Sequence, residues 1–284
     1  MEIKKIMVIG AGQMGAGIAQ VSAAAGIEVI LNDIKIEFAQ KGLNFIEKTL
    51  SKNVQKGKID ETKKSEILSK ITLSENFNDA SDCDLVIEAI VENMKVKTEV
   101  FSKLDEICKA EAILASNTSS LPITEIATST TRPDKIIGMH FMNPVPVMTL
   151  VELIRGLATS DETYDTIKSL CDTLGKFAVE VRDVPAFALN RILISMINEA
   201  IYCVYEGVSS PSDIDEIMKR GANHPMGPLQ LADFIGLDTC LAIMETMYVG
   251  YSDSKYRPCP LLRQYVKAGW LGRKSGKGFY EYNN

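Results

Sequence analysis

The chain lacks the features that define several protein classes. No apolar run approaches the roughly 20 residues that span a bilayer, so the sequence predicts no membrane segment. The first residues, MEIKKIMVIG, lead directly into a strand pattern without a signal peptide, and we expect a soluble, cytoplasmic protein. Basic residues do not predominate, and the net charge of −6 argues against nucleic acid as the main partner.

Cysteine pairs and histidines are also scarce. The six cysteines are widely spaced and form neither a Cys-x-x-Cys motif nor a cluster with histidine. This pattern is typical of reduced thiols in the cytoplasm, and it predicts no zinc or other metal site. The only histidines are His140 and His224, so any imidazole chemistry must use one of them.

The most informative motif that is present lies near the N-terminus. An apolar run over 6–9 stops at Gly10, and two further glycines follow at Gly12 and Gly15. In a strand–turn–helix unit, Gly10 permits the turn, and Gly12 lets the backbone approach a pyrophosphate. Gly15 lets the helix lie close to the strand, so that its free N–H groups face the phosphates.

An acidic residue completes the pattern of a dinucleotide site. A second apolar run, 28–32, is followed by Asp33. An acid about 20 positions beyond the glycines accepts hydrogen bonds from the adenosine ribose. Alternatively, Asp33 only caps a helix that begins near Ile34. Because strand, turn, helix, strand and acid occur in order, we predict a dinucleotide site made of Gly10, Gly12, Gln13, Met14, Gly15 and Asp33.

Apolar runs alternate with helical patterns over about the first 180 residues. Strand patterns occur at 84–88, 113–116, 135–140, 150–154 and 178–181, and helical patterns at 35–70, 94–108, 122–128 and 161–174. This alternation predicts an α/β fold with a doubly wound, mostly parallel, Rossmann-type sheet. The many lysines of 35–70 favour a solvated helical pair, and a basic arm near a phosphorylated substrate is the alternative.

The pattern becomes helical beyond residue 184. Helical patterns occur at 187–206, 212–220, 228–248 and 260–268, with a capping box at Ser212 and Asp215 and helix-ending glycines at Gly207 and Gly221. We predict a dinucleotide-binding Rossmann domain over 1–184 and an all-helical dimerisation domain over 185–284. Long apolar helices exceed what one small bundle needs, which favours a homodimer.

Polar residues gather where the predicted strands end, and ligands of open α/β sheets bind at that edge. The residues there are Glu88, Glu92, the segment 116–120, His140 and Asn143. A histidine suits proton transfer because it titrates near neutrality, although His140 could also be structural. Glu152 can orient that imidazole and stabilise its protonated form if the two strands lie side by side; otherwise it faces water. Ser119 and Ser120 could have a chemical role at this edge, or they could simply cap the following helix. For His224, a packing or capping role is favoured over catalysis.

Several motifs together resemble one family. They are Ser-Asn-Thr-Ser-Ser at 116–120, His-Phe-Met-Asn-Pro at 140–144, Leu-Val-Glu at 150–152, Asn-Arg-Ile at 190–192, Gly-Ala-Asn-His-Pro-Met-Gly-Pro at 221–228 and Gly-Lys-Gly-Phe-Tyr at 276–280. With the glycine loop and Asp33, they resemble the L-3-hydroxyacyl-CoA dehydrogenases over essentially the whole chain. Within that family the chain is most similar to the short 3-hydroxybutyryl-CoA dehydrogenases of butyrate- and butanol-forming anaerobic bacteria. The resemblance implies interconversion of (S)-3-hydroxybutyryl-CoA and acetoacetyl-CoA with NAD, NADP being the alternative cofactor.

The resemblance also implies roles for individual side chains. His140 would be the general acid and base, and Glu152 would orient it. The residues that bond the substrate oxygens would be Ser119 and Asn190. The cofactor pocket near the ribose and nicotinamide would be lined by Glu92, Lys97, Asn117 and Asn143. The CoA moiety of the acyl-CoA substrate would contact Lys52 and Lys56, contrary to the interpretation of this segment as solvated helices.

Three positions depart from the family pattern. Ala186 stands where glycine is common, Met142 where phenylalanine is common, and Thr149 where lysine is common. The proposed catalytic set is intact, so these departures bear on hinge geometry and on the shape of the acyl pocket.

Two other functions compete with dehydrogenation. One is a hydrolase that uses Ser119, His140 and Glu152 as a nucleophilic triad. The dinucleotide loop and the lack of a Gly-x-Ser-x-Gly elbow argue against it. The other is a non-catalytic nucleotide-binding protein of the same fold, which the loss of a catalytic position would support; none is lost.

Overall fold

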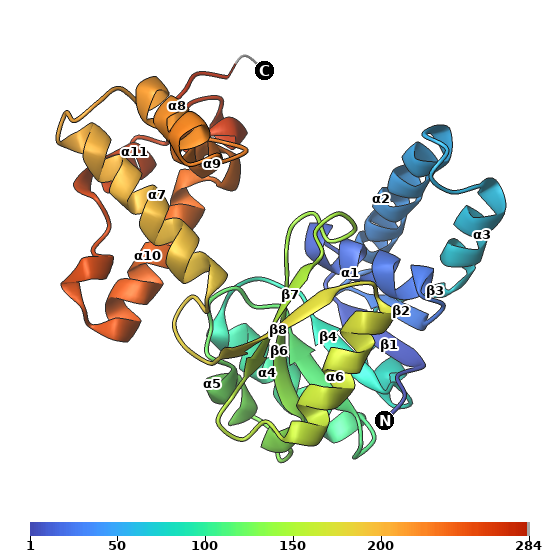
Figure 1. Ribbon diagram of the computed structural model, residues 1–284. Coiled ribbons are helices and arrows are strands. Elements are labelled where there is room, and N and C mark those ends of the chain that lie inside the picture. Colours follow the sequence, from blue (N-terminus) through green and yellow to red (C-terminus); the bar gives the residue numbers. More distant parts are fainter. Residues whose placement is uncertain (283–284) are drawn as a thin grey trace. The chain divides into compact units, whose positions relative to one another are not determined.

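The computed structural model describes residues 1–282. The chain divides into two compact units, Met1–Asp183 and Val184–Asn284 (Figure 1). The first combines a sheet with helices, and the named elements of the second, as far as residue 282, are all helices.

A single eight-stranded sheet forms the centre of the first unit. Its strand order is β3-β2-β1-β4-β5-β6-β7-β8, and all neighbours are parallel except β6 and β7. The chain order reverses between β1 and β4, as it does in doubly wound folds, so the predicted fold class is confirmed. The strands are β1 Lys5–Ile9, β2 Glu28–Asn32, β3 Ile71–Ser74, β4 Leu85–Glu88, β5 Ile113–Ser116, β6 Ile136–Phe141, β7 Leu150–Arg155 and β8 Phe177–Arg182.

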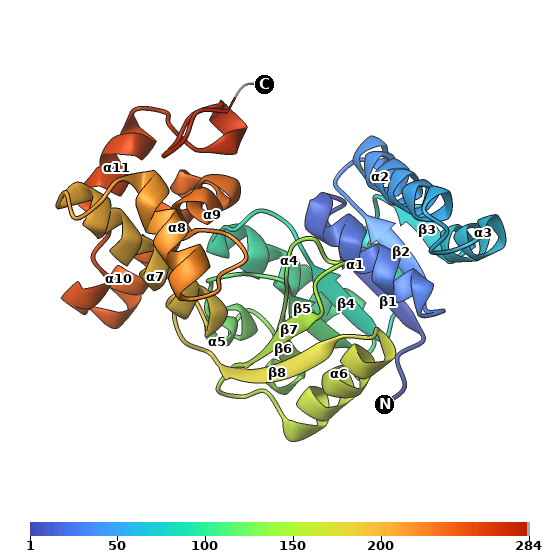
Figure 2. The ribbon, with the colours of Figure 1, turned by 45° about the horizontal axis from the view of Figure 1, so that its top comes forward.

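Helices cover both faces of this sheet (Figure 2). The central strands are almost continuously apolar because neither face meets water. Side chains alternate between the faces, so Ile6 and Val8 of β1 enter a core that also contains residues of α1, α2 and α6. Helices α4 and α5 lie on the opposite face. The helices of this unit are α1 Gln13–Ala24, α2 Ile36–Gln55, α3 Glu61–Ser69, α4 Met94–Ile107, α5 Ile123–Ala127 and α6 Asp161–Thr173.

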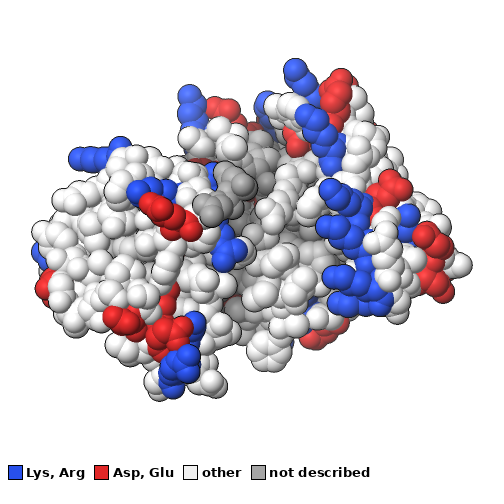
Figure 3. Space-filling view, turned by 90° about the horizontal axis from the view of Figure 1, so that it is seen from above, with Lys and Arg blue, Asp and Glu red and all other residues white. Residues whose placement is uncertain are grey.

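The lysine-rich segment is the helical pair α2 and α3, as the sequence predicts. Helix α2 buries only one stripe of residues, which packs toward the sheet: Ala39, Gly42, Ile46 and Leu50. Lysine side chains gather over the exposed side of this pair (Figure 3). Lys52 and Lys56 are exposed at the C-terminal end of α2.

The second unit has its own apolar core, formed mainly by the facing sides of α7, α9, α10 and α11. Its helices are α7 Leu189–Tyr205, α8 Pro211–Gly221, α9 Pro228–Ile235, α10 Leu237–Tyr251 and α11 Pro260–Lys267. Short 3₁₀ turns occur at Phe77–Ala80 and Pro133–Lys135 in the first unit, and at Ser254–Tyr256 and Arg273–Ser275 in the second. Among the described residues 1–282, no helix combines the length and apolar character needed to cross a membrane.

Three details of the sequence interpretation were wrong. The pattern at 228–248 is two helices, because Gly236 between them has a φ of 105°, which is incompatible with a right-handed helix. The cap of α8 is Ser210, whose Oγ accepts a hydrogen bond from the N–H of Asp213, and not the pair Ser212 and Asp215. Strand β3 was missed because four residues with an exposed Thr72 give too weak a pattern.

Ala186 shows why glycine is common at its position. Its φ is 62°, and that of Phe187 is 54°, so both lie in the left-handed region that glycine adopts without strain. Both side chains are nevertheless buried.

Candidate active site

The glycine loop has the geometry that the sequence predicts. Gly10 follows β1 with a φ of 96°, and a Cβ there would lie 2.6 Å from the Ala89 carbonyl oxygen. A Cβ on Gly15 would lie 1.7 Å from the Gly10 carbonyl oxygen, so this close turn tolerates no side chain. A Cβ on Gly12, by contrast, would meet no atom of the chain within 4 Å. Gly12 therefore leaves open space at the start of α1, where the first N–H groups have no side-chain cap.

Asp33 lies directly beside this loop at the end of β2. One carboxylate oxygen accepts a hydrogen bond of 2.8 Å from the Ala11 N–H, and the other accepts one of 2.8 Å from the Ile34 N–H. Asp33 does not cap the following helix, since α2 begins at Ile36 without a side-chain cap. The carboxylate is partly exposed at the carboxyl end of β2, one strand away from the switch point between β1 and β4.

A pocket of about 480 Å³ adjoins the loop and Asp33. Its walls are mainly apolar, and they include Ile34, Phe77, Ile90, Val91, Val96 and Val100. An apolar slot beside an acid and an uncapped helix N-terminus fits a planar base, a ribose and a diphosphate in that order. Of the other predicted loop residues, Met14 packs against the core, and Gln13 is exposed.

His140 and Glu152 form a buried cross-strand pair. They face each other in the antiparallel register of β6 and β7, and His140 Nδ1 lies 2.8 Å from Glu152 Oε2. The exposed fractions are 7 % for His140 and 2 % for Glu152. Burial strengthens this interaction. The contact with the carboxylate holds the imidazole ring in one orientation, with Nδ1 toward Glu152. The proton exchanged with a substrate would then be carried at Nε2.

Two asparagines form hydrogen bonds beside the hairpin of β6 and β7. Asn117 follows β5, and its Oδ1 accepts a hydrogen bond of 2.9 Å from the Phe141 N–H, next to His140. Asn143 accepts a bond of 2.9 Å from Gln13 Nε2, at the start of α1. The second contact joins the loop after His140 to the helix that follows the glycines.

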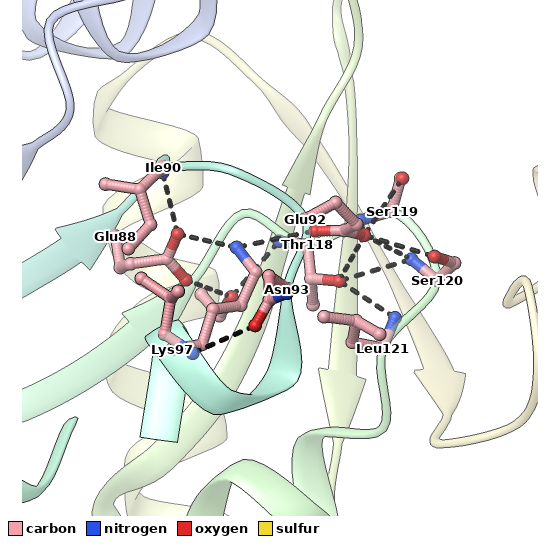
Figure 4. Close-up of polar contacts among 11 residues, drawn as sticks. Glu88, Ile90, Glu92, Asn93, Lys97, Thr118, Ser119, Ser120 and Leu121 are labelled. Atoms are coloured by element: carbon pink, nitrogen blue, oxygen red, sulfur yellow. Dashed lines mark hydrogen bonds and ion pairs between the residues drawn. The ribbon is translucent and has the colours of Figure 1, made fainter. Parts of the chain in front are cut away.

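Glu92 organises the segment that carries Ser119 (Figure 4). Its Oε1 accepts hydrogen bonds from the Thr118 hydroxyl at 2.6 Å and from the Ser119 N–H at 2.9 Å. The Ser120 N–H and the hydroxyls of Ser119 and Ser120 lie at 3.1–3.2 Å. Burial alone raises the pKa of the Glu92 carboxyl, but the Lys97 ammonium and the bonds from residues 118–120 outweigh it and hold the pKa below its usual value.

Lys97 is a buried cation. It lies in the first turn of α4, only 1 % exposed, and its ammonium is 2.6 Å from Glu88 Oε1 and 3.4 Å from Glu92 Oε2. The ammonium thus joins the two carboxylates. The remaining predicted substrate residue, Asn190, lies in the first turn of α7 in the second unit and is partly exposed.

Lys176 had no signal in the sequence, because a lysine after a helix usually faces solvent. It is buried, and its ammonium donates to the carbonyl oxygens of Val145 at 2.6 Å and Met148 at 2.8 Å. Burial lowers the pKa of this ammonium. Lys176 therefore fastens the loop that joins β6 to β7, and with it the hairpin of His140.

No group of three or more His, Cys, Asp or Glu side chains within residues 1–282 is arranged to hold a metal ion. The six cysteines are free, and burial raises the pKa of several, that of Cys83 to about 12.

Comparison with known proteins identifies the family. Residues 5–184 match the NAD binding domain of 3-hydroxyacyl-CoA dehydrogenase, and residues 187–282 match its C-terminal domain. The chain belongs to the 3-hydroxyacyl-CoA dehydrogenase family. It is an NAD-dependent dehydrogenase, which confirms the family, enzyme class and cofactor predicted from the motifs.

Individual relatives agree over their full lengths. A probable 3-hydroxybutyryl-CoA dehydrogenase of Bacillus subtilis (strain 168) is 62 % identical over 99 % of this chain and 98 % of its own. A 3-hydroxybutyryl-CoA dehydrogenase of Clostridioides difficile is 53 % identical over 98 % of this chain and 99 % of its own. The crystal structure of (S)-3-hydroxybutyryl-CoA dehydrogenase from Ralstonia eutropha superposes with a TM-score of 0.98, at 48 % identity and full coverage of both chains. Neither the hydrolase nor the non-catalytic alternative is supported.

Proposed function

We propose that this dehydrogenase interconverts (S)-3-hydroxybutyryl-CoA and acetoacetyl-CoA, with His140 as general acid and base and Glu152 as its orienting carboxylate. The observation that carries the proposal is the buried His140–Glu152 pair, 2.8 Å apart, at the carboxyl end of β6 in an NAD-binding domain. The names of the relatives support the four-carbon acyl chain.

The chain's own residues move the proton. NAD, when bound, supplies the hydride acceptor for the oxidation. In that direction the Nε2 lone pair of His140 accepts the hydroxyl proton, and the Glu152 carboxylate stabilises the resulting imidazolium. In reduction the imidazolium returns the proton to the carbonyl oxygen. In the first unit Ser119 would bond a substrate oxygen, and in the second unit Asn190 would do so.

The cofactor contacts proposed here come from the first unit. The diphosphate would face Gly10, Gly12, Gln13 and Gly15 at the start of α1, and the adenosine ribose would face Asp33. Glu92 is 36 % exposed at its side chain, so part of it remains accessible beside its internal bonds. Asn117 and Asn143 would complete the wall near the nicotinamide, and Lys97 would act from within, through Glu92.

The direct test is reduction of acetoacetyl-CoA with NADH and NADPH in parallel, followed by longer 3-oxoacyl-CoA substrates. We expect NADH to be preferred roughly tenfold or more, because the Asp33 carboxylate repels a 2′-phosphate and its neighbour Asn32 is uncharged. Lys35 lies two residues away and weakens the exclusion. Equal or higher kcat/KM with NADPH would contradict the NAD preference, and no reduction with either cofactor would contradict the proposed function.

Lys52 and Lys56 are proposed to contact the CoA phosphates. Replacing both with Ala should raise KM for acetoacetyl-CoA several-fold, and the difference should shrink at high salt because exposed charges are screened. A pantetheine substrate that lacks these phosphates should be unaffected. As a matched control, Ala at Lys103 and Lys168, exposed on α4 and α6, removes the same charge and should leave KM unchanged. Equal losses with both substrates would mean that Lys52 and Lys56 support the fold instead.

A homodimer formed by residues 185–284 is also proposed. It is supported by apolar side chains that this unit exposes: Ile192, Tyr205, Val208, Ile217, Phe234 and Val249. Light scattering at micromolar concentration should return twice the chain mass, and a monomer would contradict the proposal.

A cytoplasmic location is also proposed. The free, mostly buried thiols support it, because disulfides are rare in that compartment.

A further inference from the structure

Glu88 is a buried carboxylate with no part in the proposed reaction. It ends β4 and is fully buried, with an exposed fraction of 0 %. Its Oε1 accepts hydrogen bonds from Lys97 Nζ at 2.6 Å and from the Ile90 N–H at 2.7 Å, and its Oε2 accepts one from Ser116 Oγ at 2.7 Å. Burying a carboxylate is costly unless it is paired and hydrogen-bonded, so this arrangement calls for an explanation.

Glu88 is connected in two ways to residues 116–120, here called the Ser119 segment. In the first, Ser116 begins the segment, pairs with Glu88 in the register of β4 and β5, and accepts the Thr118 N–H at 3.2 Å through its Oγ. In the second, Lys97 joins Glu88 to Glu92, whose Oε1 then bonds residues 118–120 (Figure 4). The two routes hold the segment at its start and in its middle.

The hydrogen bonds that the Ser119 and Ser120 hydroxyls donate to Glu92 are among the longest in this network, and we expect them to weaken first when Glu92 moves. Glu92 Oε1 receives five donors, more than one carboxylate oxygen can bond well, and the hydroxyls of Ser119 at 3.2 Å and Ser120 at 3.1 Å are among the longest. A small displacement of Glu92 toward Lys97 would lengthen them further. The position of Glu92 therefore affects how the Ser119 hydroxyl is held.

We propose that Glu88 is a positioning residue for the dehydrogenase reaction, acting through Lys97 and Glu92 on Ser119. Glu88 keeps the Lys97 ammonium close to the sheet, so that Glu92 is free to bond the Ser119 segment. The assignment rests on the proposed function, in which Ser119 contacts a substrate oxygen.

Glu88→Gln tests the assignment with almost no change in shape. The amide cannot balance the ammonium, so Lys97 is drawn to Glu92 and competes with the Ser119 hydroxyl. We expect kcat for acetoacetyl-CoA reduction to fall about 10- to 100-fold, the cost of a slightly misplaced reacting group. The Kd for NADH, measured by fluorescence in the absence of substrate, should change less than about threefold, since the glycine loop and Asp33, the proposed contacts of the diphosphate and adenosine ribose, are untouched by the substitution.

A double-mutant cycle separates positioning from general destabilisation. If Glu88 acts through Ser119, the combined Glu88→Gln and Ser119→Ala protein should be no slower than Ser119→Ala alone. Asp105→Asn is the matched control, because Asp105 forms another mostly buried ion pair, with Arg132 at 2.6 Å, away from the Ser119 segment. It should lower the unfolding temperature, keep kcat, and combine independently with Ser119→Ala.

Several results would overturn the assignment. Losses that multiply in the cycle, a large rise in the NADH Kd with kcat unchanged, or equal kinetics for Asp105→Asn and Glu88→Gln would each do so. If Glu88→Gln does not fold, Ser116→Ala removes one donor to Glu88 and should show the same dependence on Ser119. A wild-type protein inactive on acetoacetyl-CoA would instead overturn the proposed function itself.

Discussion

Replacing His140 with Gln is expected to lower kcat for acetoacetyl-CoA reduction about 10²- to 10⁴-fold, the usual contribution of a positioned acid–base group. Gln preserves much of the shape and some hydrogen bonding, but it cannot carry the proton. NADH binding, measured by fluorescence, should survive, because His140 lies on β6 while the dinucleotide loop follows β1. The measurement is steady-state turnover alongside NADH titration of the same preparation.

Glu152→Gln should reduce turnover by a similar factor, because the 2.8 Å contact then no longer stabilises the imidazolium. The double variant should lose little more, since groups that act as a unit are not additive. His224→Gln supplies the matched control: it removes the other imidazole of the chain, from the second unit, and should keep normal turnover. Near-normal turnover of His140→Gln would mean that the proton acceptor lies elsewhere.

Alanine at Gly12 and alanine at Gly15 should fail in different ways. At Gly15 the added Cβ would lie 1.7 Å from the Gly10 carbonyl oxygen, so the backbone must move, and we expect a loss of about 3 kcal/mol or more in the free energy of unfolding. At Gly12 the Cβ meets no atom within 4 Å, and the φ of −66° suits alanine. Gly12→Ala should therefore keep the unfolding free energy within about 1 kcal/mol.

The same two variants distinguish folding from cofactor binding. Gly12→Ala should raise the NADH Kd at least tenfold, a cost of about 1.4 kcal/mol, because its methyl group occupies the space left for the diphosphate. Chemical denaturation and NADH fluorescence measure the two quantities on one sample. Unchanged NADH affinity in Gly12→Ala would show that the diphosphate does not approach this residue.

Most of the first unit could be predicted because most of its strands are apolar runs of four to six residues separated by amphipathic helices. The bounds of β2 and β5 agree residue for residue with the predicted runs. The errors fall where local pattern carries little information. In the edge strand β3 the exposed Thr72 interrupts the apolar run. The break at Gly236 interrupts an apolar periodicity that continues on both sides of it.

In the candidate site, too, the residues that could be predicted are those whose role depends on nearby sequence. The sequence pointed to Gly10, Gly12, Gly15 and Asp33 because each meets a local demand of a strand–turn–helix unit, and these demands depend on residues close in the chain. It also pointed to His140 from residue type and position at a strand end. The roles of Ser119, Asn190 and the lysines came only from family resemblance, since spacing carries no information on what a side chain touches.

The sequence by itself determined the alternation of strands and helices, the glycine loop, and the choice of His140 as the one histidine at the edge of the sheet. Only the tertiary structure decided that Glu152 faces His140, because their contact depends on an antiparallel register between two strands joined by a loop. The same is true of Glu88, which bonds Ser116 across neighbouring strands, and of Glu92, which bonds residues 118–120 from the loop after β4. Buried charges are stable only beside their partners, and partners far apart in sequence are chosen by the packing of the whole sheet.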